Sequence, residues 1–189
     1  MAEIELQNIA HSYNPQAADK TYALDPFNMT WVDGGRYAIL GPSGCGKTTM
    51  LNIMSGIVQP SEGKLLFDGV DVTTLSTSER NIAQVFQFPV IYGTMTVEQN
   101  LAFPLVCRNY ERPAIDAKVQ EVAEALSLQG LLKKSASRLT ADQKQLISLG
   151  RGLVRDDVAA VLMDEPLTVI DPDLKFRLRR QAFDQPFDR

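Results

Sequence analysis

Residues 41–48, Gly-Pro-Ser-Gly-Cys-Gly-Lys-Thr, decide the fold of this 189-residue chain. They match the phosphate-loop pattern G-x-x-x-x-G-K-S/T in full, and its glycines let backbone N–H groups turn inward around phosphate oxygens. Lys47 can reach the β and γ phosphates of a nucleotide, and the Thr48 hydroxyl can hold Mg²⁺. The stretch therefore predicts a mononucleotide site.

The flanks of this loop favour a ligand site over a glycine-rich turn that binds nothing. Residues 36–40 read as a short apolar strand, and residues 47–55 read as a helix that Gly56 can end in a left-handed cap. Such a helix adds the positive end of its dipole to the loop. Strand, loop and helix in this order are the context that a phosphate loop requires.

A second chemical signal lies at residues 158–165. The run 158–163 is continuously apolar, which is typical of a central parallel strand covered on both faces, and it ends in Asp164 and Glu165. In nucleotide hydrolases with a phosphate loop, the first acid supports the metal and an adjacent glutamate can polarise the attacking water. A solvated acidic strand end is the alternative, and the phosphate loop in the same chain argues against it.

Local patterns predict the remaining elements. The expected strands are residues 4–9, a second extended stretch before the turn at 33–35, the hairpin strand 64–67, and 82–86. An apolar stripe predicts a helix over residues 113–126, and another helix begins near Thr140. The first two strands indicate an antiparallel start.

Composition narrows the function classes. A net charge of -4 provides no basic face for nucleic acid. The longest apolar run is residues 158–163, against the ~20 residues of a membrane-spanning helix, and the first residues lack a signal-peptide core. Cys45 and Cys107 are too few for a disulfide framework and are not spaced as a metal site. We expect a cytosolic protein whose membrane contact comes through a partner.

The order of five segments resembles the nucleotide-binding domain of ABC transporters over nearly the whole chain. The segments are GPSGCGKTT, VFQ with Gln87, LTADQKQ, LMDEP and LTVIDP. The resemblance implies an α/β fold: a RecA-like P-loop NTPase core with an N-terminal antiparallel β portion and a helical insertion. It implies one ATP-binding domain over residues 1–189, with the core at about 1–87 and 156–189 and the helical subdomain at about 88–155.

The resemblance also assigns roles to single residues. Gln87 becomes the Q-loop glutamine, Asp171 the D-loop aspartate at a dimer seam, and Tyr13 the aromatic residue that stacks on adenine. Tyr22 competes for the last role, and a purely structural tyrosine remains an alternative. The expected nucleotide contacts are Tyr13, Gly41, Pro42, Ser43, Gly44, Cys45, Gly46, Lys47, Thr48, Thr49, Thr140, Ala141, Asp142, Gln143 and Asp171. The expected metal residues are Thr48, Gln87 and Asp164, and the expected catalytic residues are Glu165, Gln87 and Lys47.

Residues 139–143, LTADQ, align with the LSGGQ signature that in this family reaches the γ-phosphate of the opposite subunit's ATP. Thr140 keeps the hydroxyl, but Asp142 puts a carboxylate where the family has glycine. A carboxylate ~4 Å from a γ-phosphate costs about 1 kcal/mol in water and about 4 kcal/mol at an effective dielectric near 20. Thr140 and Gln143 also form a capping box ahead of an apolar helix, and both interpretations can hold together.

The family pattern places a further helix, a strand and a switch histidine after the D-loop. The single histidine of this chain is His11, which precedes the phosphate loop. We therefore expect a domain that is incomplete at its C-terminus, and that by itself binds Mg-ATP weakly and hydrolyses it poorly.

The resemblance implies ATP and Mg²⁺ as cofactors and solute import as the function, with a sugar or a polyol such as glycerol as solute. The implied partners are a second ABC ATP-binding subunit, as a homodimer or heterodimer, membrane permease subunits and, indirectly, a solute-binding protein. The place would be the cytoplasmic face of the cell membrane. The alternatives are a non-hydrolysing nucleotide-binding partner or a truncated inactive subunit. An ABC protein of DNA repair or translation would carry a long coiled coil or a second phosphate loop, and the sequence has neither.

Overall fold

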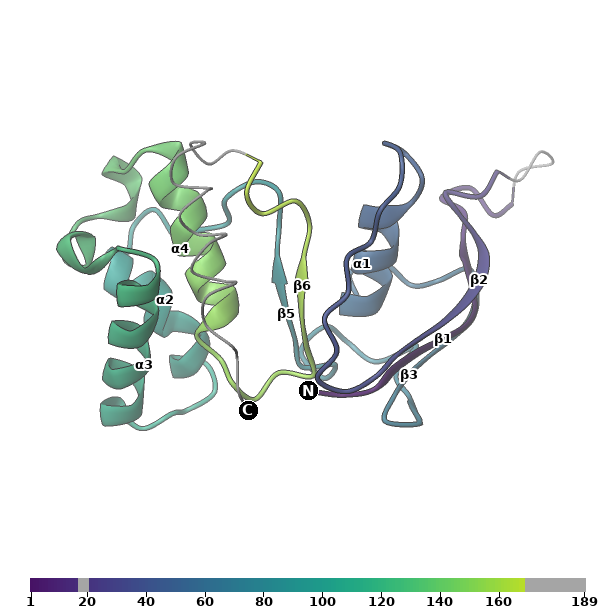
Figure 1. Ribbon diagram of the computed structural model, residues 1–189, viewed down its shortest axis with the longest axis horizontal. Helices are drawn as coiled ribbons and strands as arrows, with labels where there is room; N and C mark the ends of the chain where they lie inside the picture. Colours follow the sequence, from purple (N-terminus) through teal and green to yellow (C-terminus); the bar gives the residue numbers. More distant parts are fainter. Residues whose placement is uncertain (17–20, 169–189) are drawn as a thin grey trace. The chain divides into compact units, whose positions relative to one another are not determined.

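The computed structural model describes residues 1–16 and 21–168, which form two compact units (Figure 1). The first unit is Met1–Gln84 with Asp157–Leu162, and the second is Val85–Asp156 with the residues from Met163 on. Both strands and helices are present, as the α/β prediction requires. The expectation of one domain with a helical subdomain at about 88–155 stays a prediction.

A four-stranded antiparallel sheet opens the first unit. Its strands are β1 (Ile4–His11), β2 (Leu24–Trp31), β3 (Glu62–Phe67) and β4 (Val70–Asp71), in the order β2-β1-β3-β4. In the register, Ile4 lies opposite both Trp31 and Phe67. The predicted antiparallel start and the hairpin after residue 64 are therefore confirmed, and β1 to β3 are seen side by side in Figure 1.

Helix α1 (Lys47–Ser55) begins and ends where the sequence predicts. Gly56 closes it with φ 83°, a left-handed conformation that costs glycine little, and its N–H bonds to the Ile53 carbonyl. Met50, Ile53 and Met54 of the helix are buried in the core of the first unit. The hydrophobic face of α1 thus fixes the loop that precedes it.

The buried side chain of Arg80 holds the C-terminal end of α1. Its buried guanidinium donates hydrogen bonds to the carbonyls of Ile53 and Met54 at the end of the helix, and to those of Thr73 and Leu75 in the loop after β4. Burial lowers the pKa of the Arg80 guanidinium from its ordinary value. A cation at this position also complements the negative end of the helix dipole.

The predicted strand at residues 36–40 is wrong for the described structure. No strand pairs with this segment among residues 1–16 and 21–168, and the side chain of Leu40 is 91% exposed. Instead, Tyr37 folds back, packs its ring on Trp31 and accepts a hydrogen bond from the Val32 N–H through its hydroxyl. An apolar stretch becomes a strand only where a neighbour completes its ladder.

Strands β5 (Ile82–Val85) and β6 (Ala160–Met163) form a two-stranded sheet. The Ala159 N–H bonds to the Asn81 carbonyl and the Asp164 N–H to the Val85 carbonyl, both at 2.9 Å, so the strands run parallel. Both strands were predicted. The prediction that residues 158–163 form a central strand covered on both faces is wrong here, because the sheet has no third described strand and Met163 is exposed.

The second unit is helical. It holds α2 (Val97–Val106), α3 (Arg112–Ala125) and α4 (Ala141–Leu153), with short 3₁₀ turns η1 (Gln129–Leu131) and η2 (Ala136–Arg138). The three helices share one hydrophobic core, in which Gly150 lets α4 approach closely: a Cβ there would lie 2.6 Å from Leu101. Within the described residues, the helices are too short or too polar to cross a bilayer.

Candidate functional site

The loop before α1 has the backbone conformation that its glycines allow. Gly44 and Gly46 adopt φ 82° and φ 91°, in the left-handed region. A Cβ at Gly46 would lie 2.6 Å from the Ala23 carbonyl oxygen, so a side chain at Gly46 is excluded by contact as well as by φ. The loop can turn tightly around an anion because these two positions carry no side chain.

Lys47 and the start of α1 are arranged for such an anion. The Lys47 Nζ arches back to the Gly41 and Pro42 carbonyls, both at 2.8 Å. The N-cap, Gly46, offers the first N–H groups of α1 no side-chain acceptor, and the first turn contains no acid. By contrast, Thr96 and Thr140 close α2 and α4 with complete capping boxes. An uncapped helix start beside an ammonium group suits phosphate oxygens.

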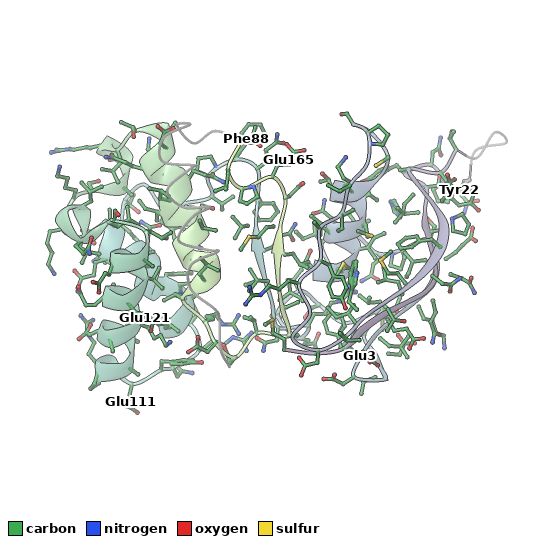
Figure 2. All side chains as sticks on the ribbon, in the orientation of Figure 1. Glu3, Tyr22, Phe88, Glu111, Glu121 and Glu165 are labelled. Carbon is green, nitrogen blue, oxygen red and sulfur yellow. The ribbon has the colours of Figure 1, made fainter. Side chains whose placement is uncertain are left out.

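Tyr13 is tied to the helix that follows this loop. Its hydroxyl lies 3.2 Å from the Thr49 Oγ1, while its ring is 66% exposed and rests edge-on against His11. The competing Tyr22 donates its hydroxyl to the Glu62 carboxylate at 2.7 Å (Figure 2). An exposed ring with an anchored hydroxyl favours Tyr13 as the stacking residue, which stays a prediction.

The acidic pair lies in a tight turn directly after β6. The Asp164 N–H donates the last hydrogen bond to β5. The next residue, Glu165, adopts φ 45°. The other described non-glycine residues with positive φ are Asn, Asp or Ser, so a glutamate here is unusual. Thr168 holds the turn, donating its N–H to the Glu165 carbonyl at 3.1 Å and its hydroxyl to the carboxylate at 3.2 Å. Glu165, which is labelled in Figure 2, is exposed.

Gln87 follows β5 by two residues and belongs to the same unit as Asp164 and Glu165. Its half-buried side chain makes no hydrogen bond within the described part of the chain, so its amide is available to a ligand. Gln145, to which the sequence assigned no role, joins the backbone before Gln87 to the backbone after Glu165. The Gln145 side chain donates to the Phe86 carbonyl at 3.0 Å and to the Pro166 carbonyl at 2.9 Å.

The signature segment starts α4 as predicted. Thr140 is the N-cap, Gln143 donates its N–H to the Thr140 hydroxyl at 3.3 Å, and the Gln143 side chain accepts the Thr140 N–H at 3.2 Å. The capping box is therefore confirmed. Asp142 lies in the first turn, half-buried, and no hydrogen bond or ion pair among the described residues holds its carboxylate.

The remaining predictions concern the metal site, the two cysteines and Asp171. No group of three acidic, histidine or cysteine side chains is gathered in the described ranges. Mg²⁺ takes one or two protein carboxylates and completes its shell with water and phosphate, and the assignment of Thr48, Asp164 and Gln87 to this ion stays a prediction. Cys45 and Cys107 are free and exposed. Asp171 lies outside the described residues.

The sequence profile of the ABC transporter family matches residues 24–168, which include the phosphate loop, the signature segment and the acidic pair. The chain belongs to the ABC transporter family. The trehalose import ATP-binding protein SugC of Mycobacterium tuberculosis is 41% identical, covering 95% of this chain and 44% of that protein. The sn-glycerol-3-phosphate import ATP-binding protein UgpC of Escherichia coli K12 is 36% identical, covering 95% of this chain and 49% of that protein. The chain thus spans about half the length of these relatives.

Solved structures confirm the fold class. A nucleotide-free ATP-binding cassette of an ABC transporter matches with a TM-score of 0.72 and 26% identity, over 97% of this chain and 78% of that one. The dimeric cassette MJ0796 bound to ADP and phosphate matches with a TM-score of 0.82 and 24% identity, over 95% of this chain and 81% of that one. These similarities show that the chain has the ABC-type α/β fold.

Proposed function

We propose that this chain is the ATP-binding part of an ABC import system, binding Mg-ATP and hydrolysing it at a dimer interface to drive solute uptake. The observation that carries the proposal is the phosphate loop: two left-handed glycines, an uncapped α1 and a lysine whose ammonium group donates to the Gly41 and Pro42 carbonyls and to the Cys45 Sγ. The direct test is saturable binding of ATP that Lys47→Ala removes.

In this proposal each residue has a chemical task. Lys47 exchanges its carbonyl partners for the β and γ phosphates, and the Thr48 hydroxyl, Asp164 and Gln87 supply oxygens to Mg²⁺. The metal, when bound, neutralises charge on the phosphates. Glu165 takes a proton from the attacking water as general base. Tyr13 stacks on adenine, and the signature residues Thr140, Ala141, Asp142 and Gln143, with Asp171, serve the dimer partner's side of the site.

The solute class follows the relatives. Their printed names specify import of trehalose and of sn-glycerol-3-phosphate, so we infer a sugar or a polyol for this chain. Permease subunits, a second ATP-binding subunit and, indirectly, a solute-binding protein are the inferred partners, at the cytoplasmic face of the membrane. Residues 88–92 support a permease contact, since Phe88, Val90 and Tyr92 are exposed apolar or aromatic side chains directly after Gln87.

A specific observation favours a second candidate, a subunit that binds ATP but completes no active signature. Asp142 places a carboxylate in the first turn of α4 that has no partner among the described residues, where the family's mechanism expects a γ-phosphate to approach. The same chain also has an acid at this position of α2, because Glu98 follows Thr96 as Asp142 follows Thr140, and Glu98 pairs with Lys133. A carboxylate at this position stabilises the N-terminal end of the helix dipole, but it repels an approaching phosphate.

Replacing Asp142 by glycine is expected to raise ATP hydrolysis by about tenfold or more, since it removes a like charge from the approach of the γ-phosphate. The measurement is phosphate release at saturating Mg-ATP, for the chain alone and mixed with a candidate partner subunit. Glu98→Gly is the control, because it replaces an acid by glycine at the same position of α2, away from the signature, and additionally breaks the pair with Lys133. Equal rates for Asp142→Gly and the parent chain would favour the non-hydrolysing partner.

A further inference from the structure

Three side chains on one face of α4 hold the backbone that follows β5. Gln145, Ser148 and Arg151 recur at intervals of three residues, so they lie along the same side of the helix. The Gln145 amide donates to the Phe86 carbonyl at 3.0 Å, and the Ser148 hydroxyl accepts the Val90 N–H at 3.3 Å. Arg151 donates to the Val90 carbonyl at 2.7 Å. All of these residues belong to the second unit.

In residues 88–92, the backbone of Val90 and Tyr92 is held in place, the side chains of Phe88, Val90 and Tyr92 are exposed, and Ile91 packs against the core of the second unit. Asn100, which is fully buried, brackets Tyr92 by accepting its N–H at 2.8 Å and donating to its carbonyl at 3.0 Å. The Arg151 guanidinium lies 4.6 Å from the centre of the Tyr92 ring. A force applied to these exposed side chains would therefore act on the hydrogen bonds between this backbone and α4.

Gln145 differs from the other two because it has a second backbone partner. Its amide nitrogen also donates to the Pro166 carbonyl at 2.9 Å, the residue directly after Glu165. The side chain is fully buried, and carbonyls can only accept, so the chemistry fixes its NH₂ group toward both. Its oxygen has no hydrogen-bond partner among the described residues. One buried NH₂ group thus ties the backbone before Gln87 to the backbone after Glu165.

We propose that Gln145 is a positioning residue that couples segment 88–92 to the Glu165 turn. If either carbonyl moved away alone, the buried Gln145 amide would lose a hydrogen-bond partner, which is unfavourable because a buried donor without a partner costs free energy. The two carbonyls therefore move together with α4, whose first turn is the signature. The inference rests on the proposed function, since it assigns the coupled ends to a permease contact and to the catalytic glutamate.

The test is amide hydrogen exchange, measured by mass spectrometry with and without Mg-ATP, in peptides covering residues 41–48, 86–92 and 164–168. In the parent chain, Mg-ATP is expected to slow exchange in all three. In Gln145→Met, which keeps the length but removes both donors, the change at 41–48 and 164–168 is expected to persist while the change at 86–92 is lost. Ser148→Ala, the matched control on the same face, loosens only the Val90 bond and is expected to keep the nucleotide response of all three peptides.

The outcomes separate the two proposals. No response of peptide 41–48 in the parent chain would count against ATP binding itself. Any of three results would overturn the role of Gln145. In the first, the parent chain responds at 41–48 but not at 86–92. In the others, Gln145→Met keeps the response at 86–92, or Ser148→Ala removes that response to the same extent. If Gln145→Met loses its cooperative melting transition, Gln145→Asn takes its place, because the shorter amide can reach only one of the two carbonyls.

Discussion

Replacing Glu165 by glutamine is expected to lower the rate of ATP hydrolysis by about 10²–10⁴-fold, the usual contribution of a general base. An amide cannot take the proton of the attacking water, whereas its oxygen can still accept the hydrogen bond that Thr168 donates. The turn should therefore keep its shape, and nucleotide affinity should stay within about twofold. The measurement is single-turnover phosphate release at saturating Mg-ATP, made in the parent chain and in the Asp142→Gly background, where we expect faster turnover.

Glu121→Gln provides the control for this experiment. Glu121 is an exposed glutamate of α3 that pairs with Lys118 at 2.9 Å (Figure 2). Its replacement removes the same charge from the second unit and is expected to leave the rate unchanged. A Glu165→Gln chain that hydrolyses ATP as fast as its parent would remove Glu165 from the proposed mechanism.

Replacing Arg80 by methionine is expected to lower the free energy of unfolding by on the order of 3–5 kcal/mol, because several buried carbonyls lose a donor and each unsatisfied buried acceptor costs about 1–3 kcal/mol. The change removes the guanidinium donor from the Met54, Thr73 and Leu75 carbonyls, and it leaves the Ile53 carbonyl with the Gly56 N–H alone. Since a domain is stable by only about 5–15 kcal/mol, Arg80→Met should unfold at much lower denaturant concentration or fail to accumulate. Urea denaturation followed by circular dichroism measures the shift.

Two further variants show whether the loss comes from the buried carbonyl network. Arg80→Lys keeps the charge but has a single ammonium group that cannot span the four carbonyls, so an intermediate loss is expected. Arg112→Met breaks only the exposed pair with Asp116, which should cost about 0.5 kcal/mol or less. Equal stability of Arg80→Met and Arg112→Met would contradict the role given to Arg80.

Elements with a local signal were predicted from the sequence, and elements that depend on a distant partner were not. Helix α1 needed only its apolar face and Gly56, and α4 needed only the Thr140 capping box. The same Thr-x-x-Gln signal precedes α2, and attention to Thr96 would have located that helix. Residues 36–40 have strand-like composition, but composition cannot show whether a neighbouring strand is present.

The site divides in the same way. The phosphate loop and the acidic pair are contiguous motifs, so the sequence identified Lys47 and Glu165 at once. Gln145 lies in the LTADQKQ segment but received no role from it, and Arg80 lies in no motif, because their roles come from carbonyls far away in the chain: Phe86 is 59 positions from Gln145, and Ile53 is 27 from Arg80. Side chains that serve backbone acceptors can be found only once the fold brings those acceptors together.

The central claim, that residues 41–48 bind nucleotide phosphate, is tested most directly by titrating the purified chain with ATP and Mg²⁺ in a calorimeter, beside Lys47→Ala. We predict saturable heat for the parent chain, at the weak affinity expected of this chain alone, and none for Lys47→Ala with an unchanged melting temperature. Absence of binding by the parent chain, or equal binding by a folded Lys47→Ala chain, would contradict the account.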